Sequence, residues 1–149
     1  MRFDAATASR FGGWLAGLWA GALLAIALIA APAAFAALPV AEAGRVVARI
    51  FAREAPASLA LSAALFAVVR QRARAAAVRG GSVVDADVLM VLGTLFCTVA
   101  GYYAVQPMMA AARIGRGPLS FGALHGVSLG FFALKGLLAM ALAWRLAVR

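Results

Sequence analysis

Four long apolar segments, separated by short stretches rich in arginine, glycine and proline, run through this 149-residue chain. An α-helix needs about 20 predominantly apolar residues to cross the hydrocarbon core of a bilayer. Within that core the backbone must satisfy its own hydrogen bonds, which a helix does and an irregular loop does not. The pattern predicts an all-α integral membrane protein, a four-transmembrane-helix bundle that forms a single membrane domain over residues 1–149.

The low content of charged residues excludes a water-soluble globule. Only 13% of the residues are charged and the mean hydropathy is +0.98, whereas soluble domains carry about 25% charged residues. The formal net charge of +9 comes from arginines in the gaps between apolar segments, with Lys135 as the single lysine. Because no separate basic surface remains, we expect no nucleic-acid partner.

The helix boundaries follow from prolines, glycines and charges. We expect helices at about residues 11–38, 45–70, 86–109 and 121–145, with an amphipathic segment at 41–54. Pro39 stops the first helix. The apolar stretch 55–69 covers only about 22 Å at 1.5 Å per residue, short of the ~30 Å core, so the second helix must begin inside the amphipathic segment.

The arginines also predict the orientation. Placing the amino terminus inside puts eight arginines on the inner side and five on the outer side, which favours a bacterial inner membrane protein with both termini in the cytoplasm. The inner set is Arg2, Arg10, Arg70, Arg72, Arg74, Arg79, Arg145 and Arg149, and the outer set is Arg45, Arg49, Arg53, Arg113 and Arg116. The outer residues Arg45, Arg49 and Arg53 form one stripe of the amphipathic segment, where we expect them to bind lipid headgroups.

Glycines recur at four-residue spacing in the first and fourth helices. Membrane helices associate where small residues allow close backbone approach. The sequence therefore predicts glycine zippers that place these two helices at the packed centre, with a homo-oligomer through one zipper as a further option. The glycines are Gly13, Gly17 and Gly21 in the first helix and Gly122, Gly126 and Gly130 in the fourth.

Ionisable residues inside the membrane are the strongest candidates for function, because each costs roughly 2.5–3.5 kcal/mol to insert. Lys135 shares a helical stripe with His125 and Ser128, so the fourth helix carries a polar line to mid-membrane. Counted from its inner boundary, Glu54 differs in depth from Lys135 by about 9 Å. We therefore expect Lys135 to have no carboxylate partner in this chain and to bind a ligand, a lipid headgroup or another subunit. The alternative is that the polar line of the fourth helix only forms hydrogen bonds between helices.

The outer ends of the third and fourth helices offer a second polar group. Gln106 joins the predicted polar interior, and Met108, Met109 and His125 are weak candidates for copper because thioether and imidazole ligands suit cuprous ions. No nucleophile–base pair, Cys-x-x-Cys motif or phosphate-binding loop occurs. The sequence therefore favours a non-enzymatic protein, with no cofactor predicted.

Several short motifs resemble a family of small bacterial membrane proteins. They are Trp14-Leu15-Ala16-Gly17, Ala31-Pro32, Leu38-Pro39, Ala43-Gly44-Arg45, Gln106-Pro107 and Leu124-His125. The family is the domain of unknown function 4149, related to the eukaryotic transmembrane protein 205, and the resemblance implies a four-helix bundle without a settled activity. More distantly, the pattern is similar to copper-resistance membrane proteins and to a haem-pathway oxidase, although the first helix lacks the histidine that haem ligation would need.

Three functional hypotheses follow. The leading hypothesis is a non-enzymatic inner-membrane protein that binds a small ligand or lipid, or that is an accessory subunit of a larger membrane complex. Its polar interior would comprise His125, Ser128, Lys135, Glu54 and Gln106. The alternative is a small-solute or copper transporter or chaperone, and the third is a haem-dependent membrane oxidase.

Overall fold

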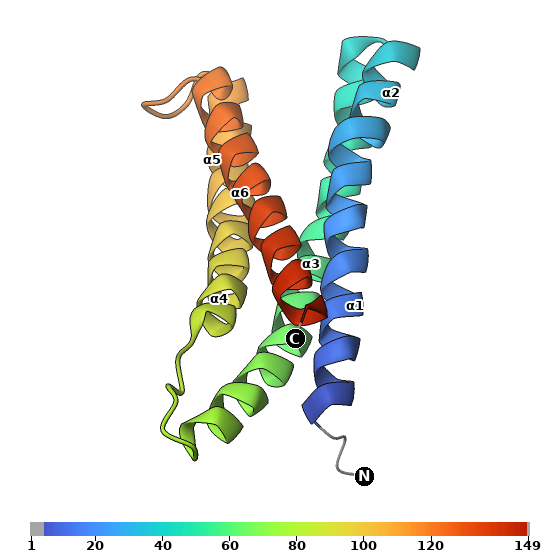
Figure 1. Cartoon of the computed structure of the whole chain (residues 1–149). Helices are drawn as coiled ribbons and strands as arrows, with labels where there is room; N and C mark the ends of the chain where they lie inside the picture. The colour runs from blue at the N-terminus through green and yellow to red at the C-terminus, as the bar shows by residue number, and fades with distance from the viewer. Residues whose placement is uncertain (1–4, 149) are drawn as a thin grey trace.

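The computed structural model describes residues 5–148, and this part of the chain is entirely helical outside its short turns (Figure 1). The elements are α1 (Ala5–Ala25), the π-helix η1 (Ile26–Ala30), α2 (Ala31–Ala37), α3 (Val40–Ala77), α4 (Ala86–Thr98), the π-helix η2 (Val99–Ala104), α5 (Val105–Arg113) and α6 (Phe121–Ala147). Arg2 and Arg149, which enter the predicted charge bias, lie outside the described residues. The all-α prediction is confirmed.

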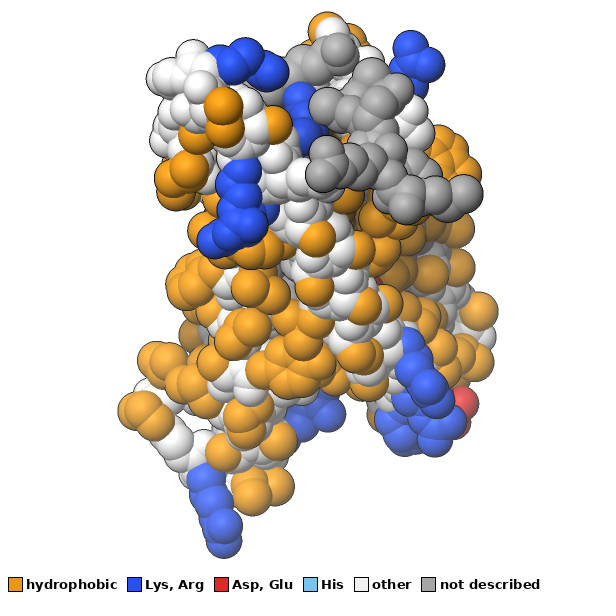
Figure 2. Space-filling view, turned by 90° about the horizontal axis from the view of Figure 1, so that it is seen from below, with side chains coloured by type: hydrophobic (Ala, Val, Ile, Leu, Met, Phe, Trp, Pro, Cys, Tyr) orange, Lys and Arg blue, Asp and Glu red, His pale blue; other side chains and the backbone are white. Residues whose placement is uncertain are grey.

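Four stretches of helix are long and apolar enough to cross a membrane: Thr7–Ala37, Val40–Ala77, Ala86–Arg113 and Phe121–Ala147. Their outer surfaces carry large apolar side chains that only lipid would shield, such as Leu28, which is 70% exposed. Seen from the end that carries the termini, hydrophobic side chains spread over the flanks, and the basic side chains form separate groups (Figure 2). The chain is therefore a multi-pass membrane protein.

The helix ends follow from local chemistry. Pro39 precedes α3, while the side chains of Asp85 and Ser120 cap α4 and α6 by accepting from Val88 N and Ala123 N at 3.0 and 3.2 Å. The amphipathic segment 41–54 is the first part of α3 and not a separate element, since one helix runs without interruption from Val40 to Ala77. Its continuity solves the length problem of the second span.

The first and third spans each contain a π-helical stretch just before a proline. Pro32 follows η1 and Pro107 follows η2. A proline inside a helix removes one hydrogen bond and its ring clashes with the carbonyl four residues earlier. Those carbonyls belong to Leu28 and Tyr103, inside η1 and η2, so the wider π turn accommodates each proline without ending the span.

The four spans form a bundle that opens toward one end. α1 packs against α3 and α6, and α4 packs against the same two helices, so α3 and α6 face each other across the centre. The main core lies toward the end that carries the termini and includes Leu23, Leu65, Val91, Leu142 and Leu146. Toward the other end, α2 pairs with α3 and α5 pairs with α6, and these two arms diverge (Figure 1).

The glycine zipper prediction is wrong for the packing inside this chain. A Cβ atom added at Gly17, Gly21, Gly122, Gly126 or Gly130 would meet nothing within 4 Å. Only Gly13 of the predicted glycines lies at a close approach, with Ala147 N 3.3 Å from its Cβ position. The first and fourth spans do pack together, with Gly12 and Gly13 close to Leu146 and Ala147 near the termini, while Ala16 and Ala20 are buried in the main core.

Candidate functional site

Lys135 lies at the centre of the bundle and has a carboxylate partner. Its Nζ atom donates to Glu54 Oε1 at 2.7 Å, and the two side chains are 4% and 8% exposed. The prediction of an unpartnered lysine is therefore wrong. The depth comparison between Glu54 and Lys135 assumed that every helix crosses the membrane upright. The half of α3 nearer the termini instead runs obliquely (Figure 1). The lysine side chain also leans toward the amino-terminal end of its own helix, which brings it to Glu54.

Two further side chains complete the network around this ion pair. Ser58, one turn after Glu54, donates to Glu54 Oε1 and accepts from Lys135 Nζ at 3.3 Å. Trp19 of α1 donates through Nε1 to Ser58 Oγ at 3.0 Å. The buried polar site therefore joins three spans, and it does not follow the predicted polar line along the fourth helix beyond Lys135.

Aromatic rings seal the ion pair on the side of α6. The Nζ atom of Lys135 lies 5.0 Å from the centre of the Phe132 ring, and that ring meets Phe51 edge to face at 5.1 Å. Such a ring attracts a cation through its negative face. Water is thereby kept from the ammonium and carboxylate groups, which strengthens their attraction, and the site balances its own charge.

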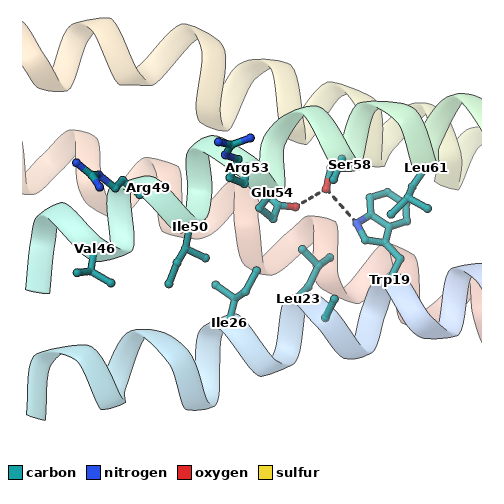
Figure 3. A pocket seen from close by; sticks show the side chains of 12 residues that line it. Trp19, Leu23, Ile26, Val46, Arg49, Ile50, Arg53, Glu54, Ser58 and Leu61 are labelled. Atoms are coloured by element: carbon teal, nitrogen blue, oxygen red, sulfur yellow. Dashed lines mark hydrogen bonds between the residues drawn. The ribbon is translucent and has the colours of Figure 1, made fainter. Parts of the chain in front are cut away.

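A groove between α1 and α3 leads to this network. Its cavity volume is about 610 Å³, and its walls are apolar side chains from the first two spans, including Leu23 on α1, Ile26 on η1, and Val46 and Ile50 on α3 (Figure 3). Small side chains widen it, since Ala22 and Ala57 also line the walls. Trp19, Glu54 and Ser58 lie at one end of the groove, joined by hydrogen bonds (Figure 3).

The three arginines of the predicted lipid-binding stripe have different surroundings. Arg45 lies 4.0 Å from the carboxylate of Glu42, both largely exposed. Arg49 and Arg53 line the groove and are exposed. Among the described residues, neither Arg49 nor Arg53 forms an ion pair, so two positive charges border an apolar groove.

The other predicted site residues are not part of this network. Ser128 donates to the Gly101 carbonyl at 2.8 Å and joins α6 to η2, while the exposed His125 stacks on Phe121. Gln106 lies half-buried on α5. Ser128 thus has the structural role that the alternative interpretation gave to the polar stripe.

The weak copper candidates are also dispersed. Met109 is buried in an apolar cluster with Val105 and Leu124, whereas Met108 is 43% exposed. In the described part of the chain no group of three or more His, Cys, Asp or Glu side chains could hold a metal ion. The two methionines therefore point to different environments.

A second ion-pair cluster, which the sequence interpretation missed, ties the helices near the termini. Asp87 is 1% exposed, accepts from Arg145 Nε at 2.6 Å and lies 3.6 Å from Arg72 Nη1. Its position two residues after the capping residue Asp85 also places a favourable negative charge at the start of α4. The signal that could have found it is the presence of arginines near the same boundary on two other helices.

These features define a four-span membrane protein with a charge-paired interior and one lateral groove. Residues 14–118 match the family model described as Domain of unknown function (DUF4149), so the chain belongs to this family. The match confirms the family resemblance and covers the first three spans, while α6 and Lys135 lie beyond it. Neither the curated proteins nor the solved structures contain a match to this chain.

Proposed function

We propose that this protein is a non-enzymatic membrane protein that binds an anionic amphiphile, such as an acidic phospholipid, in the groove between α1 and α3. The observation that carries the proposal is the composition of that groove: apolar walls bordered by Arg49 and Arg53, neither of them paired among the described residues. An acyl chain matches the walls, and a phosphate group matches the two guanidinium groups.

The polar end of the groove favours the same type of ligand. Glu54 and Ser58 are already hydrogen-bonded to Lys135 and Trp19, so the ligand does not need to neutralise the ion pair. A neutral polar atom of the ligand, such as a glycerol or ester oxygen, could still hydrogen-bond there without leaving a charge unpaired. The arrangement therefore supports a bound amphiphile and not a small inorganic ion.

For the membrane itself, we propose the bacterial inner membrane with both termini in the cytoplasm. The excess of arginines near the end that carries the termini supports this orientation. The groove and its arginines would then open toward the outer leaflet. An accessory role in a larger complex, or a homo-oligomer, is compatible with a bound lipid and is read out by the same experiment.

Native mass spectrometry of the protein, extracted with a mild detergent from cells, tests the proposal. We expect an acidic phospholipid to remain bound, and we expect Ala57→Trp, which fills the groove, to remove it. The matched control is Ala63→Trp, since Ala63 is exposed on the same helix outside the groove. Arg49→Gln with Arg53→Gln should remove the preference for acidic over zwitterionic lipid.

Three results would contradict the proposal. The first is lipid retention that is equal in Ala57→Trp and in Ala63→Trp. The second is a wild-type protein that carries zwitterionic and acidic lipids in proportion to their abundance in the membrane. The third is a stoichiometric metal ion or haem bound in place of lipid, which would favour the copper or the oxidase hypothesis.

A further inference from the structure

The chain consists of two helical hairpins of the same construction. In each hairpin a span interrupted by a π-helix is followed, after a short turn, by one continuous helix: α1–η1–α2 and α3 in the first, α4–η2–α5 and α6 in the second. Each interrupted span has its proline after the π-helix, Pro32 and Pro107. Both hairpins start near the end that carries the termini and return to it (Figure 1).

Equivalent residues of the two continuous helices meet at the centre of the bundle. Glu54 and Lys135 each lie 14 residues after the first residue of their helix and bind each other. Phe51 and Phe132, each 11 residues after that start, also contact each other. In a two-fold arrangement, residues that touch their own equivalents lie on the axis. The axis that relates the hairpins therefore passes between α3 and α6 at these two pairs.

The buried positions follow the same register. With the 81-residue separation of Glu54 from Lys135, three other pairs of equivalent residues are both buried: Ala43 with Leu124, Ser58 with Ala139, and Leu65 with Leu146. With the 75-residue separation of the two prolines, the interrupted spans match in the same way: Ala16 with Val91, Trp19 with Thr94, and Leu23 with Thr98. The two hairpins thus share these buried positions, although Ala20 is 4% exposed and its equivalent Leu95 is 36% exposed.

The hairpins differ at the groove. The equivalent of Ile50, which lines the groove of the first hairpin, is Phe131 in the second. Phe131 packs edge to face on Phe96 and lies directly against the backbone of Gly101. A Cβ atom added at Gly101 would lie 2.5 Å from the Cβ atom of Phe131. In the second hairpin an aromatic ring therefore fills the space that stays open in the first hairpin.

We propose that the two hairpins are rocking halves and that their motion carries the amphiphile of the groove from one end of the bundle to the other. Some transporters are built from parallel repeats related by an axis along the membrane normal, and transporter substrate sites lie at the interface between repeats. The groove belongs to the first hairpin but reaches this interface at Glu54, which binds Lys135 of the second hairpin. The proposal rests on the proposed function, because the cargo is the ligand of the groove. It adds movement to binding.

The contacts between the halves are placed as this motion requires. Near the termini the halves are tied by Ser9 Oγ, which donates to Leu146 O at 3.2 Å, and by Arg72 beside Asp87. At the opposite end the arms diverge (Figure 1). The Glu54–Lys135 pair lies between these regions, so a headgroup moving along the bundle passes a charged, hydrogen-bonding site at the point where bare hydrocarbon would be most costly.

A cysteine lock between the halves tests the motion. Ser62 of α3 and Thr94 of α4 belong to different halves, and their side-chain oxygen atoms are 3.3 Å apart. In a Cys97→Ser background, Ser62→Cys with Thr94→Cys is reconstituted into phosphatidylethanolamine–phosphatidylglycerol vesicles that contain a fluorescent phosphatidylglycerol. Translocation is followed by extraction of a short-chain label into external fatty-acid-free albumin, which leaves the disulfide intact, and binding is followed by native mass spectrometry.

We expect the reduced protein to translocate the label faster than protein-free vesicles do. The oxidised protein should lose this activity but keep its bound lipid, and reduction should restore it. Equal translocation by oxidised and reduced protein, or retained lipid binding with translocation no faster than in empty vesicles, would overturn the rocking proposal alone. Loss of lipid binding from the reduced protein would overturn the proposed function.

Two further measurements do not depend on the disulfide. Spin labels at Leu38 and Leu119, which lie in the outer turns of the two halves, should report a distance distribution that shifts when phosphatidylglycerol is added. An unchanged distribution contradicts the motion. The exchange Glu54→Lys with Lys135→Glu should give folded protein where either single change does not, because it restores the ion pair between the halves. A double variant as poorly folded as the singles contradicts this pairing.

Discussion

Removal of the Lys135 ammonium group perturbs the centre of the bundle most directly. Lys135→Met keeps most of the aliphatic side chain but leaves Glu54 with Ser58 as its hydrogen-bond donor. Breaking one side of a buried ion pair costs about 3–5 kcal/mol, whereas hydrogen bonds between membrane helices average only about 0.6 kcal/mol. Because Glu54 is 8% exposed and keeps Ser58 as a donor, we expect a loss between these limits, roughly 2–3 kcal/mol, close to the cost of one membrane charge.

The test is a double-mutant cycle measured by reversible unfolding in mixed detergent micelles. Glu54→Gln should cost about as much as Lys135→Met, and the double variant should cost less than the sum of the two by about 2 kcal/mol, because it leaves no orphaned charge. Leu137→Met is the matched control, since Leu137 is 60% exposed on the same helix. Single effects that simply add, or a loss in the control equal to that of Lys135→Met, would refute the reasoning.

Three more changes can be measured in the same unfolding assay. Trp19→Phe should cost about 0.6–1.7 kcal/mol because it removes one interhelical hydrogen bond. Its control, Trp144→Phe, changes a side chain that is 73% exposed and should cost nothing measurable. Equal losses in the two variants would contradict the network. Gly101→Ala should cost about 1–3 kcal/mol through overpacking. Gly126 has open space around it, so Gly126→Ala should be neutral or stabilising by up to about 1 kcal/mol. A larger loss in Gly126→Ala than in Gly101→Ala would contradict the helix packing. Asp87→Asn should cost about 2–3 kcal/mol, less than a fully buried pair because the Arg72 and Arg145 side chains are 19% and 32% exposed. A change below about 0.5 kcal/mol would show that the cluster is not structural.

The sequence was sufficient for the class of fold because the four spans are determined by local hydrophobicity. Apolar length, prolines and capping residues such as Asp85 and Ser120 act within a few residues of the chain. The π-helices were not predicted, although both precede a proline, because a proline in a membrane helix can also produce a kink. The glycine zippers failed because four-residue spacing identifies a helix face without saying whether protein or lipid covers it.

The candidate site was only half predictable. Lys135 and Glu54 stood out because membrane charges are costly, but their pairing depends on how obliquely α3 runs, which no local pattern encodes. Trp19 and Ser58 are individually unremarkable in an apolar helix. Their role appears only when three helices are placed in register, and the groove depends on the same placement.

Occupancy of the groove is the central claim, and photocrosslinking tests it most directly. Purified protein is reconstituted with a phosphatidylglycerol that carries a diazirine in its acyl chain, irradiated, digested and mapped by mass spectrometry. We predict adducts concentrated on Leu23, Ile50 and Leu61, which line the groove, and lost in Ala57→Trp. Adducts spread evenly over lipid-facing positions such as Leu89 and Leu137, which are 58% and 60% exposed, with no enrichment in the groove, would contradict the account.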